Sequence, residues 1–200
     1  FFDGYIYFDD EKITEVTAKE YPVSETYDMT GYYVSAGFID IHTHGGGGYR
    51  FEGSTDEIVK ACDFHLKHGT TSIVPTISAA EFDSMAESVI SVKNAMNDPR
   101  VKGTIIGAHM EGPYLSRKQA GAQCPAYITV PFEEDYLHFI EKNASAIARW
   151  TYAPENDKEE KFAKTLKKYD IVASAGHTDA IYSDMLRAFE NGCQLVTHLY

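Results

Sequence analysis

Several features are scarce in this sequence of 200 residues, and each absence excludes a class of protein. No apolar run reaches the roughly 20 residues of a transmembrane helix, so we expect no membrane partner. The 18 lysines and arginines are outnumbered by 30 acidic residues, for a formal net charge of −12, which argues against nucleic acid as a partner. The three cysteines, Cys62, Cys124 and Cys193, are odd in number and far apart. They indicate no disulfide framework, and we predict a cytoplasmic location.

The remaining composition is that of a globular protein, and its patterning changes near residue 34. Hydrophobic residues make up 44% of the chain, enough for a real core. Residues 1–34 hold short β-rich pieces around polar turns, and we assign them to a small β-sandwich part. From residue 35 onward, predicted strands and helices alternate, which indicates a parallel sheet with crossover helices. The predicted strands span residues 33–44, 70–76, 103–112, 146–155, 170–177 and 193–199. The predicted helices span residues 54–68, 80–96, 132–145, 157–169 and 180–191.

The six predicted strands fit either an open doubly wound sheet or most of a closed barrel. Histidines or acidic residues lie at the carboxyl ends of five of them. An open sheet collects its ligands at one switch point, whereas a TIM barrel uses the loops after every strand. We therefore predict an α/β fold, a TIM (β/α)₈ barrel. About six βα units lie in residues 35–200, the first part of a catalytic barrel that we expect to continue beyond this chain.

The segment GFIDIHTHGGGG, residues 37–48, places two histidines at the end of a strand. His42 and His44 are two residues apart, so their side chains share one face. The glycines that follow allow a sharp bend and leave room for a substrate. No Gly-Lys-Ser/Thr follows them, so they are not a phosphate-binding loop. A lone buried histidine is more often a hydrogen-bonded core residue than a ligand.

Residues at the other strand ends favour a metal site over hydrogen-bonded core histidines. Glu111 ends the third predicted strand, His177 the fifth and His198 the sixth. Imidazole and carboxylate together suit zinc or iron. We predict one divalent-metal site built from these residues with His42 and His44.

Glu155 follows the fourth predicted strand and has two readings. It could orient a neighbouring ligand, or it could cap the helix that starts near Asp157. We favour the helix cap.

Six segments carry a resemblance to a known family: GFIDIHTHGGGG, GTTSIVPT, GAHMEGPYLSRKQAGAQ, YAPE, SAGHTDA and THLY. They resemble the N-acetylglucosamine-6-phosphate deacetylases of the amidohydrolase superfamily. The H-x-H pair marks only the superfamily, whereas H-x-E-G-P followed by a Gly-Ala pair is more specific to the deacetylases. The resemblance covers residues 36–200 and implies that the TIM (β/α)₈ barrel is of the metal-dependent amidohydrolase type.

The resemblance implies roles for individual residues. Glu111, His177 and His198 match the principal metal ligands, with Glu111 in place of the carboxylated lysine of many superfamily members. His42 and His44 match a pair that holds a second ion, so one or two divalent ions, zinc or iron, are expected. A separate segment, Ala122 and Gln123, matches the part that contacts substrate, although some relatives have histidine where this chain has Gln123. The catalytic aspartate of the family is expected beyond Tyr200, so the chain has no catalytic residue of its own and is expected to be inactive alone.

The resemblance also implies the reaction. It is the metal-dependent hydrolysis of the acetamide of N-acetylglucosamine 6-phosphate to glucosamine 6-phosphate and acetate, in the catabolism of amino sugars. The expected partners are the phosphorylated amino sugar and a second copy of the chain in a homodimer. The alternatives are an N-acetylgalactosamine-6-phosphate deacetylase, a cyclic-amide hydrolase or a deaminase, and a barrel that binds metal or sugar phosphate without turnover.

Overall fold

The computed structural model describes residues 3–199. The chain divides into two compact units, Phe1–Ala36 and Gly37–Tyr200. The domain limits 1–34 and 35–200, and the β-sandwich assignment of the first part, stay predictions, and residues 1 and 2 lie outside the described part.

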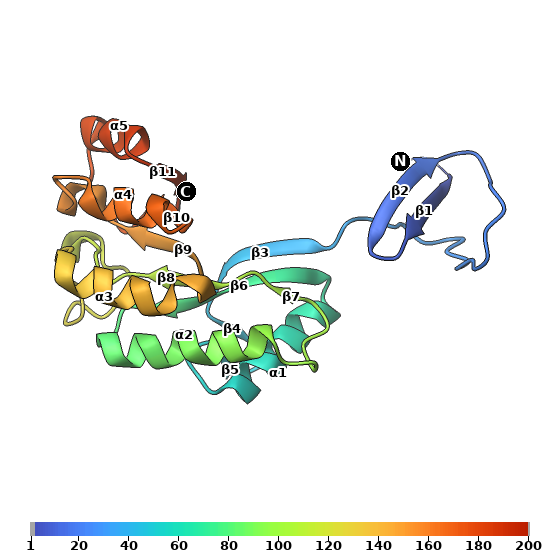
Figure 1. Ribbon diagram of the computed structural model, residues 1–200, viewed down its shortest axis with the longest axis horizontal. Coiled ribbons are helices and arrows are strands. Elements are labelled where there is room, and N and C mark those ends of the chain that lie inside the picture. The colour runs from blue at the N-terminus through green and yellow to red at the C-terminus, as the bar shows by residue number, and fades with distance from the viewer. Residues whose placement is uncertain (1–2, 200) are drawn as a thin grey trace. The chain divides into compact units, whose positions relative to one another are not determined.

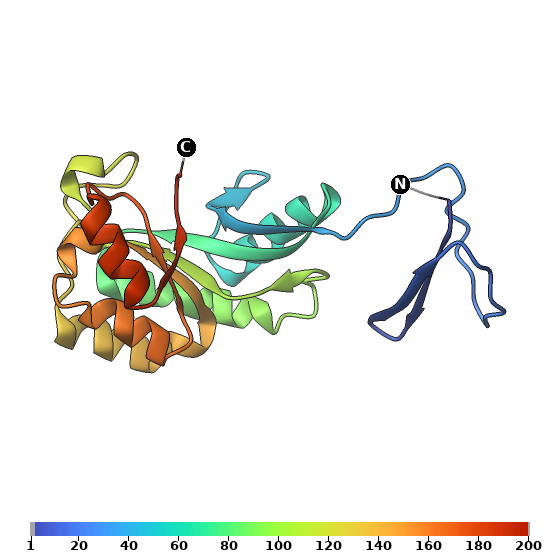
Figure 2. The ribbon, with the colours of Figure 1, turned by 90° about the horizontal axis from the view of Figure 1, so that it is seen from above.

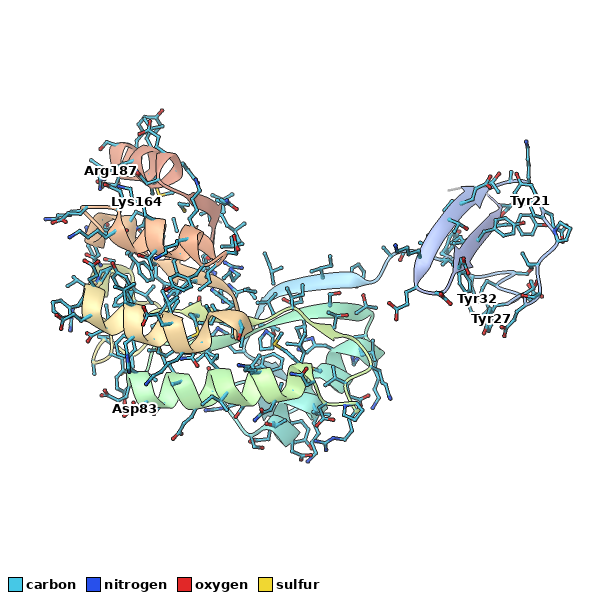
Figure 3. The ribbon with its side chains drawn as sticks, in the orientation of Figure 1. Tyr21, Tyr27, Tyr32, Asp83, Lys164 and Arg187 are labelled. Atoms are coloured by element: carbon cyan, nitrogen blue, oxygen red, sulfur yellow. The ribbon has the colours of Figure 1, made fainter. Side chains whose placement is uncertain are left out.

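The first unit contains a two-stranded antiparallel sheet. Strand β1 (Tyr5–Asp9) pairs with β2 (Lys12–Thr17). Between them Asp10 has a positive φ of 50°, a backbone conformation that aspartate tolerates in tight turns. The Tyr7 hydroxyl accepts a hydrogen bond of 2.6 Å from the backbone N–H of Tyr21, which fastens the following loop to the hairpin (Figure 3).

The second unit contains a seven-stranded sheet and five α-helices (Figures 1 and 2). Its strands are β3 (Phe38–Thr43), β6 (Thr70–Ser78), β7 (Thr104–Ile105), β8 (Ala108–Glu111), β9 (Ile147–Tyr152), β10 (Val172–Ala175) and β11 (Cys193–Val196). Its helices are α1 (Thr55–Lys67), α2 (Phe82–Met96), α3 (Glu133–Asn143), α4 (Lys161–Lys168) and α5 (Tyr182–Glu190). A small hairpin, β4 (Gly45–Gly46) with β5 (Tyr49–Arg50), and three 3₁₀ turns, Arg117–Gln119, Ala144–Ala146 and Pro154–Asn156, complete the unit.

The strand order identifies the kind of sheet. It runs β3-β6-β8-β9-β10-β11, with β7 paired to β6, and every pair in it is parallel. Each new strand therefore lies beside the one before it, without the reversal that defines the switch point of a doubly wound sheet. The five helices follow one another around one side of the sheet (Figure 1). The unit is part of a TIM-type barrel, as the sequence predicted.

Several predicted elements differ from the observed ones. The first predicted strand begins at Phe38 rather than at residue 33. The third predicted strand is broken into β7 and β8 at Gly107, whose φ is 150° and where a Cβ would lie 2.9 Å from the backbone nitrogen of Ala148. Helix α4 begins at Lys161 rather than at residue 157, because Glu160 before it has a left-handed φ of 52°. The predicted helix over residues 54–68 is confirmed, with Ser54 as its N-cap.

The two faces of the sheet differ in polarity. One set of alternating strand residues packs into the apolar core with the helices, among them Ile77, Met110, Trp150 and Ala173. The other set is polar and buried: Thr76, His109, Glu111, Arg149, Thr151 and Ser174. The interior of the barrel is therefore polar near its carboxyl edge. Among residues 3–199, no helix has both the length and the hydropathy to cross a membrane.

Ion pairs connect helix α5 to the start of helix α4. The Arg187 guanidinium on α5 lies 2.6 Å from a carboxylate oxygen of Glu160, and the Lys164 ammonium on α4 lies 3.9 Å from the same side chain (Figure 3). These charges fix the last helix beside its predecessor.

We expect Phe162→Ala to lower the free energy of unfolding by about 3–5 kcal/mol, because it removes the centre of the aromatic core. The fully buried Phe162 ring lies 4.9–5.5 Å, centroid to centroid, from Tyr114, Tyr136, Trp150 and Tyr152. Denaturant titration measures the change. The control is Phe132→Ala, at a ring 57% exposed, which should change the stability by no more than about 0.5 kcal/mol. Equal losses in the two variants would contradict this view of the core.

Candidate metal centre

Five side chains gather at the carboxyl edge of the sheet. His42 lies in β3 and His44 directly after it, and Glu111 is the last residue of β8. His177 follows β10, and His198 follows β11. Parallel strands all end at the same edge, so residues up to 156 positions apart in the chain meet there.

The Glu111 carboxylate is the point at which these side chains meet. Its Oε1 lies 3.0 Å from Nε2 of His42 and 3.1 Å from Nε2 of both His177 and His198. Its Oε2 lies 3.0 Å from Nε2 of His44. The Glu111 side chain is only 2% exposed. The structure thus brings all five predicted ligands together, with His44 on one carboxylate oxygen and the other three histidines on the second.

The protonation of the centre follows from these contacts. Burial raises the pKa of Glu111, but hydrogen bonds from His177, His42 and His44 outweigh burial and hold that pKa well below its usual range. In return, the hydrogen bond to Glu111 raises the pKa of His44 to about 9 and also raises the pKa of His177. Without a metal, the carboxylate is charged and favours the protonated forms of His44 and His177. A metal ion binds unprotonated imidazole, so its binding would release these protons.

The donor set fits a divalent cation. His42, Glu111 and His198 offer three ligand atoms that all lie within 4.8 Å of one another. Three nitrogen and oxygen donors from the protein are typical of catalytic zinc, and imidazole with carboxylate also suits iron. The contacts of the His177 ring also fit a role as a metal ligand. Its Nδ1 lies 2.9 Å from the Gln119 carbonyl, which can only accept, so Nδ1 donates there. Loss of the proton that Nε2 donates to Glu111 would leave this nitrogen free to bind a metal.

Two of the histidines have unusual backbone conformations. The φ angle is 48° at His177 and 56° at His198. Residues other than glycine rarely adopt this left-handed region, which costs of order 1–3 kcal/mol and concentrates at functional sites. Both rings reach Glu111 from these conformations.

Gln123 lies beside the same carboxylate. Its Oε1 accepts from the backbone N–H of Ala79 at 3.0 Å, and its Nε2 therefore donates to Oε2 of Glu111 at 2.9 Å. The neighbouring Ala122 is exposed. The segment that the resemblance assigned to substrate thus borders the centre, and its contact with substrate stays a prediction.

Sequence reasoning missed one contact and misjudged another. Glu52 lies 3.8 Å from Nδ1 of His44 and accepts from the Ser78 hydroxyl at 2.9 Å, and no motif marked it. Glu155 was expected to cap a helix, which is wrong. Its carboxylate binds the Thr178 hydroxyl and the backbone N–H of Asp179, directly after His177.

The helix cap expected of Glu155 comes from another residue. The Asp157 carboxylate accepts from the N–H groups of Phe162 and Ala163 at 3.2 and 2.9 Å, in the first turn of α4. Glu155 instead holds the loop that carries His177.

Comparison with known proteins gives a consistent group of relatives. Residues 33–200 match the Amidohydrolase family. The chain is 32% identical over 180 residues to the N-acetylglucosamine-6-phosphate deacetylase of Haemophilus influenzae, covering 88% of this chain and 46% of that protein. It is also 32% identical to an N-acetylgalactosamine-6-phosphate deacetylase of a Shewanella species, covering 87% of this chain and 44% of that one.

A solved structure shows the same fold. It is a mutant N-acetyl-D-glucosamine-6-phosphate deacetylase of Mycobacterium smegmatis in complex with N-acetyl-D-glucosamine-6-phosphate. The TM-score is 0.89 at 28% identity, over 98% of this chain and 51% of that chain. The chain thus spans about half the length of the relatives it matches.

We expect Glu111→Gln to lower the bound divalent metal of the purified complete protein from about one or two ions per chain toward background. The substitution keeps the shape of the side chain but removes the charge on which the histidines converge. Elemental analysis after gel filtration measures the metal. Glu134→Gln, at an exposed glutamate of α3, is the matched control. Unchanged metal content in the Glu111 variant would contradict a metal centre at this place.

Replacement of both His42 and His44 by alanine should lower the metal count or the turnover while the circular dichroism spectrum stays unchanged. His177, His198 and Gln123 still reach the Glu111 carboxylate in this variant, so we expect the fold to persist. The control replaces the exposed His68 and His138 in the same way. Wild-type stoichiometry together with wild-type turnover would show that the pair is structural.

Proposed function

The chain belongs to the amidohydrolase family, and from this membership we propose that the complete protein hydrolyses the acetamide of N-acetylglucosamine 6-phosphate. The products are acetate and glucosamine 6-phosphate. The observation that carries the proposal is the convergence of four imidazole nitrogens on the buried Glu111 carboxylate, at the edge of the sheet where barrel enzymes hold their substrates. The names of the relatives supply the substrate.

The proposed ligands are Glu111, His177 and His198, joined by His42 and His44, for one or two ions of zinc or iron. A divalent ion held there supplies Lewis acidity, which polarises the amide carbonyl and lowers the pKa of the attacking water. Glu111 contributes the only carboxylate charge among these five side chains, and its burial keeps bulk water away from it.

In the reaction, the oxygen of a water molecule adds to the acetamide carbonyl carbon. The carbon–nitrogen bond then breaks, and a proton of the water ends on the departing amine. We propose that an aspartate beyond Tyr200 carries this proton, as general base and then general acid. Ala122 and Gln123 would line the substrate, with Gln123 held in place by Ala79 and Glu111.

The location and assembly state are also part of the proposal. We propose a cytoplasmic protein, supported by three free cysteines. A homodimer is the state that the resemblance implies. A second candidate substrate, the 6-phosphate of N-acetylgalactosamine, is favoured by the Shewanella relative, which is as similar as the Haemophilus one.

The test is hydrolysis of four compounds by the complete protein, measured as acetate release for the three acetylated sugars and as ring opening for the cyclic amide. The compounds are N-acetylglucosamine 6-phosphate, the unphosphorylated sugar, the galactosamine isomer and dihydroorotate as a cyclic amide. We expect the highest kcat/KM with N-acetylglucosamine 6-phosphate, because a phosphate remote from the amide adds binding energy that positions the carbonyl. Faster turnover of the isomer would favour the second candidate. Preference for the free sugar or the cyclic amide, or no turnover at all, would overturn the proposal.

A further inference from the structure

A layer of buried polar side chains lies directly below the candidate ligands. Each is at most 5% exposed, and together they come from five strands or strand ends. The members are Thr76, His109, Arg149, Thr151, Ser174 and Thr197. Polar groups are costly in a protein interior unless they are hydrogen-bonded, so their contacts must account for them.

Hydrogen bonds connect this layer from one edge of the sheet toward the other. The Thr76 hydroxyl accepts from the backbone N–H of Thr43 on β3 at 3.1 Å and lies 3.0 Å from Nδ1 of His109. Nε2 of His109 lies 2.7 Å from the Thr151 hydroxyl, which lies 2.9 Å from that of Thr197. The path thus passes from β3 through β6, β8 and β9 to the end of β11.

Arg149 closes this path into a ring. Its Nη1 donates to the backbone carbonyl of Ile41 at 3.0 Å. Its Nη2 donates to the Thr197 hydroxyl at 2.6 Å and to the Ser174 hydroxyl at 3.1 Å. Because β3 and β11 are the outermost strands in the order of the sheet, one guanidinium joins its two edges.

The groups that Arg149 binds are neighbours of the ligands. Ile41 directly precedes His42, and Thr197 directly precedes His198. The two imidazole rings lie 4.9 Å apart, centroid to centroid, although their strands are at opposite edges. The His109 ring packs edge-on against that of His42 at 4.6 Å. A shift in the layer therefore moves both ligands.

Burial of the Arg149 guanidinium costs free energy, which indicates that its directed hydrogen bonds have a structural role. Burial lowers the pKa of Arg149 to about 10, although the charge of Glu111 acts to raise it. Within residues 3–199 no carboxylate lies close enough to Arg149 to form an ion pair. Its Nε, also buried, has no hydrogen-bond partner among the described residues. An unpaired buried charge is expensive, and an apolar side chain could fill the space at lower cost. What an apolar side chain could not do is hold two edges of a sheet through directed bonds.

We propose that Arg149 is a positioning residue for the metal centre, which fixes His42 relative to His198 by holding the backbone and side chain beside them. The inference rests on the metal site of the proposed function. Arg149 itself touches neither the metal nor the substrate. It sets the distance between His42 and His198, whose strands β3 and β11 do not pair with each other.

The decisive variant is Arg149→Lys, which keeps the charge but loses the fork that reaches acceptors on three strands. We expect the complete protein to bind Zn²⁺ about 10- to 100-fold more weakly, measured by competition with a chromophoric chelator. The visible absorption spectrum of the Co²⁺-loaded variant should differ from that of the wild type, because the ligands no longer keep their spacing. The matched control is Arg100→Lys, at an exposed arginine paired with Asp56 and Asp98, which should change neither reading.

A second variant keeps the test open if Arg149→Lys does not fold. Thr197→Val preserves the shape of the side chain but removes the hydroxyl that Arg149, Thr151 and Ser174 share. It should weaken Zn²⁺ binding in the same direction, whereas Thr165→Val on α4 should not.

The outcomes separate this inference from the function it rests on. Weaker Zn²⁺ binding with a changed Co²⁺ spectrum in a folded variant supports the inference. A wild type that binds Zn²⁺, with folded variants that match it in affinity and spectrum, would overturn the inference alone. A wild type that binds no divalent ion would overturn the proposed metal centre and the inference with it.

Discussion

The buried carboxylate of Glu111 is the constraint around which the second unit is arranged. A charge that is 98% removed from solvent is tolerable only where donors surround it, and here every donor except Gln123 is an imidazole. These imidazoles come from strand ends that are far apart in sequence, so the carboxylate is satisfied only when β3, β8, β10 and β11 end at matching heights. The parallel registers of the sheet provide this alignment.

The two faces of the sheet have opposite polarity. Toward the helices, Met110 and Trp150 join a dense apolar and aromatic core. One residue further along the same strands, Glu111 and Thr151 face a polar interior. Side chains alternate along a strand, so neighbouring residues of the same strands form the apolar core and the polar centre without conflict.

The sequence predicted most of this arrangement because its signals were local. H-x-H spacing, the Glu-Gly-Pro end of β8 and histidines after two later strands each follow from period-2 alternation and strand termination. The contacts of Arg149 could not be predicted, because Ile41 is 108 residues away and is bound through its backbone carbonyl, which any residue would provide. Glu155 was misjudged for a related reason. A carboxylate before a helix resembles a cap, and only the folded chain shows that Asp157 takes that place.

The left-handed backbone at His177 and His198 limits how these positions can evolve. Glycine, asparagine and aspartate tolerate that conformation, whereas valine or isoleucine does not. If a descendant of this protein lost metal binding, histidine would no longer be needed at these two positions. The left-handed backbone conformation would still restrict which residues could replace it. In such a descendant we expect asparagine or glycine at these two loop positions, because the backbone would keep its left-handed conformation there after the imidazoles were lost.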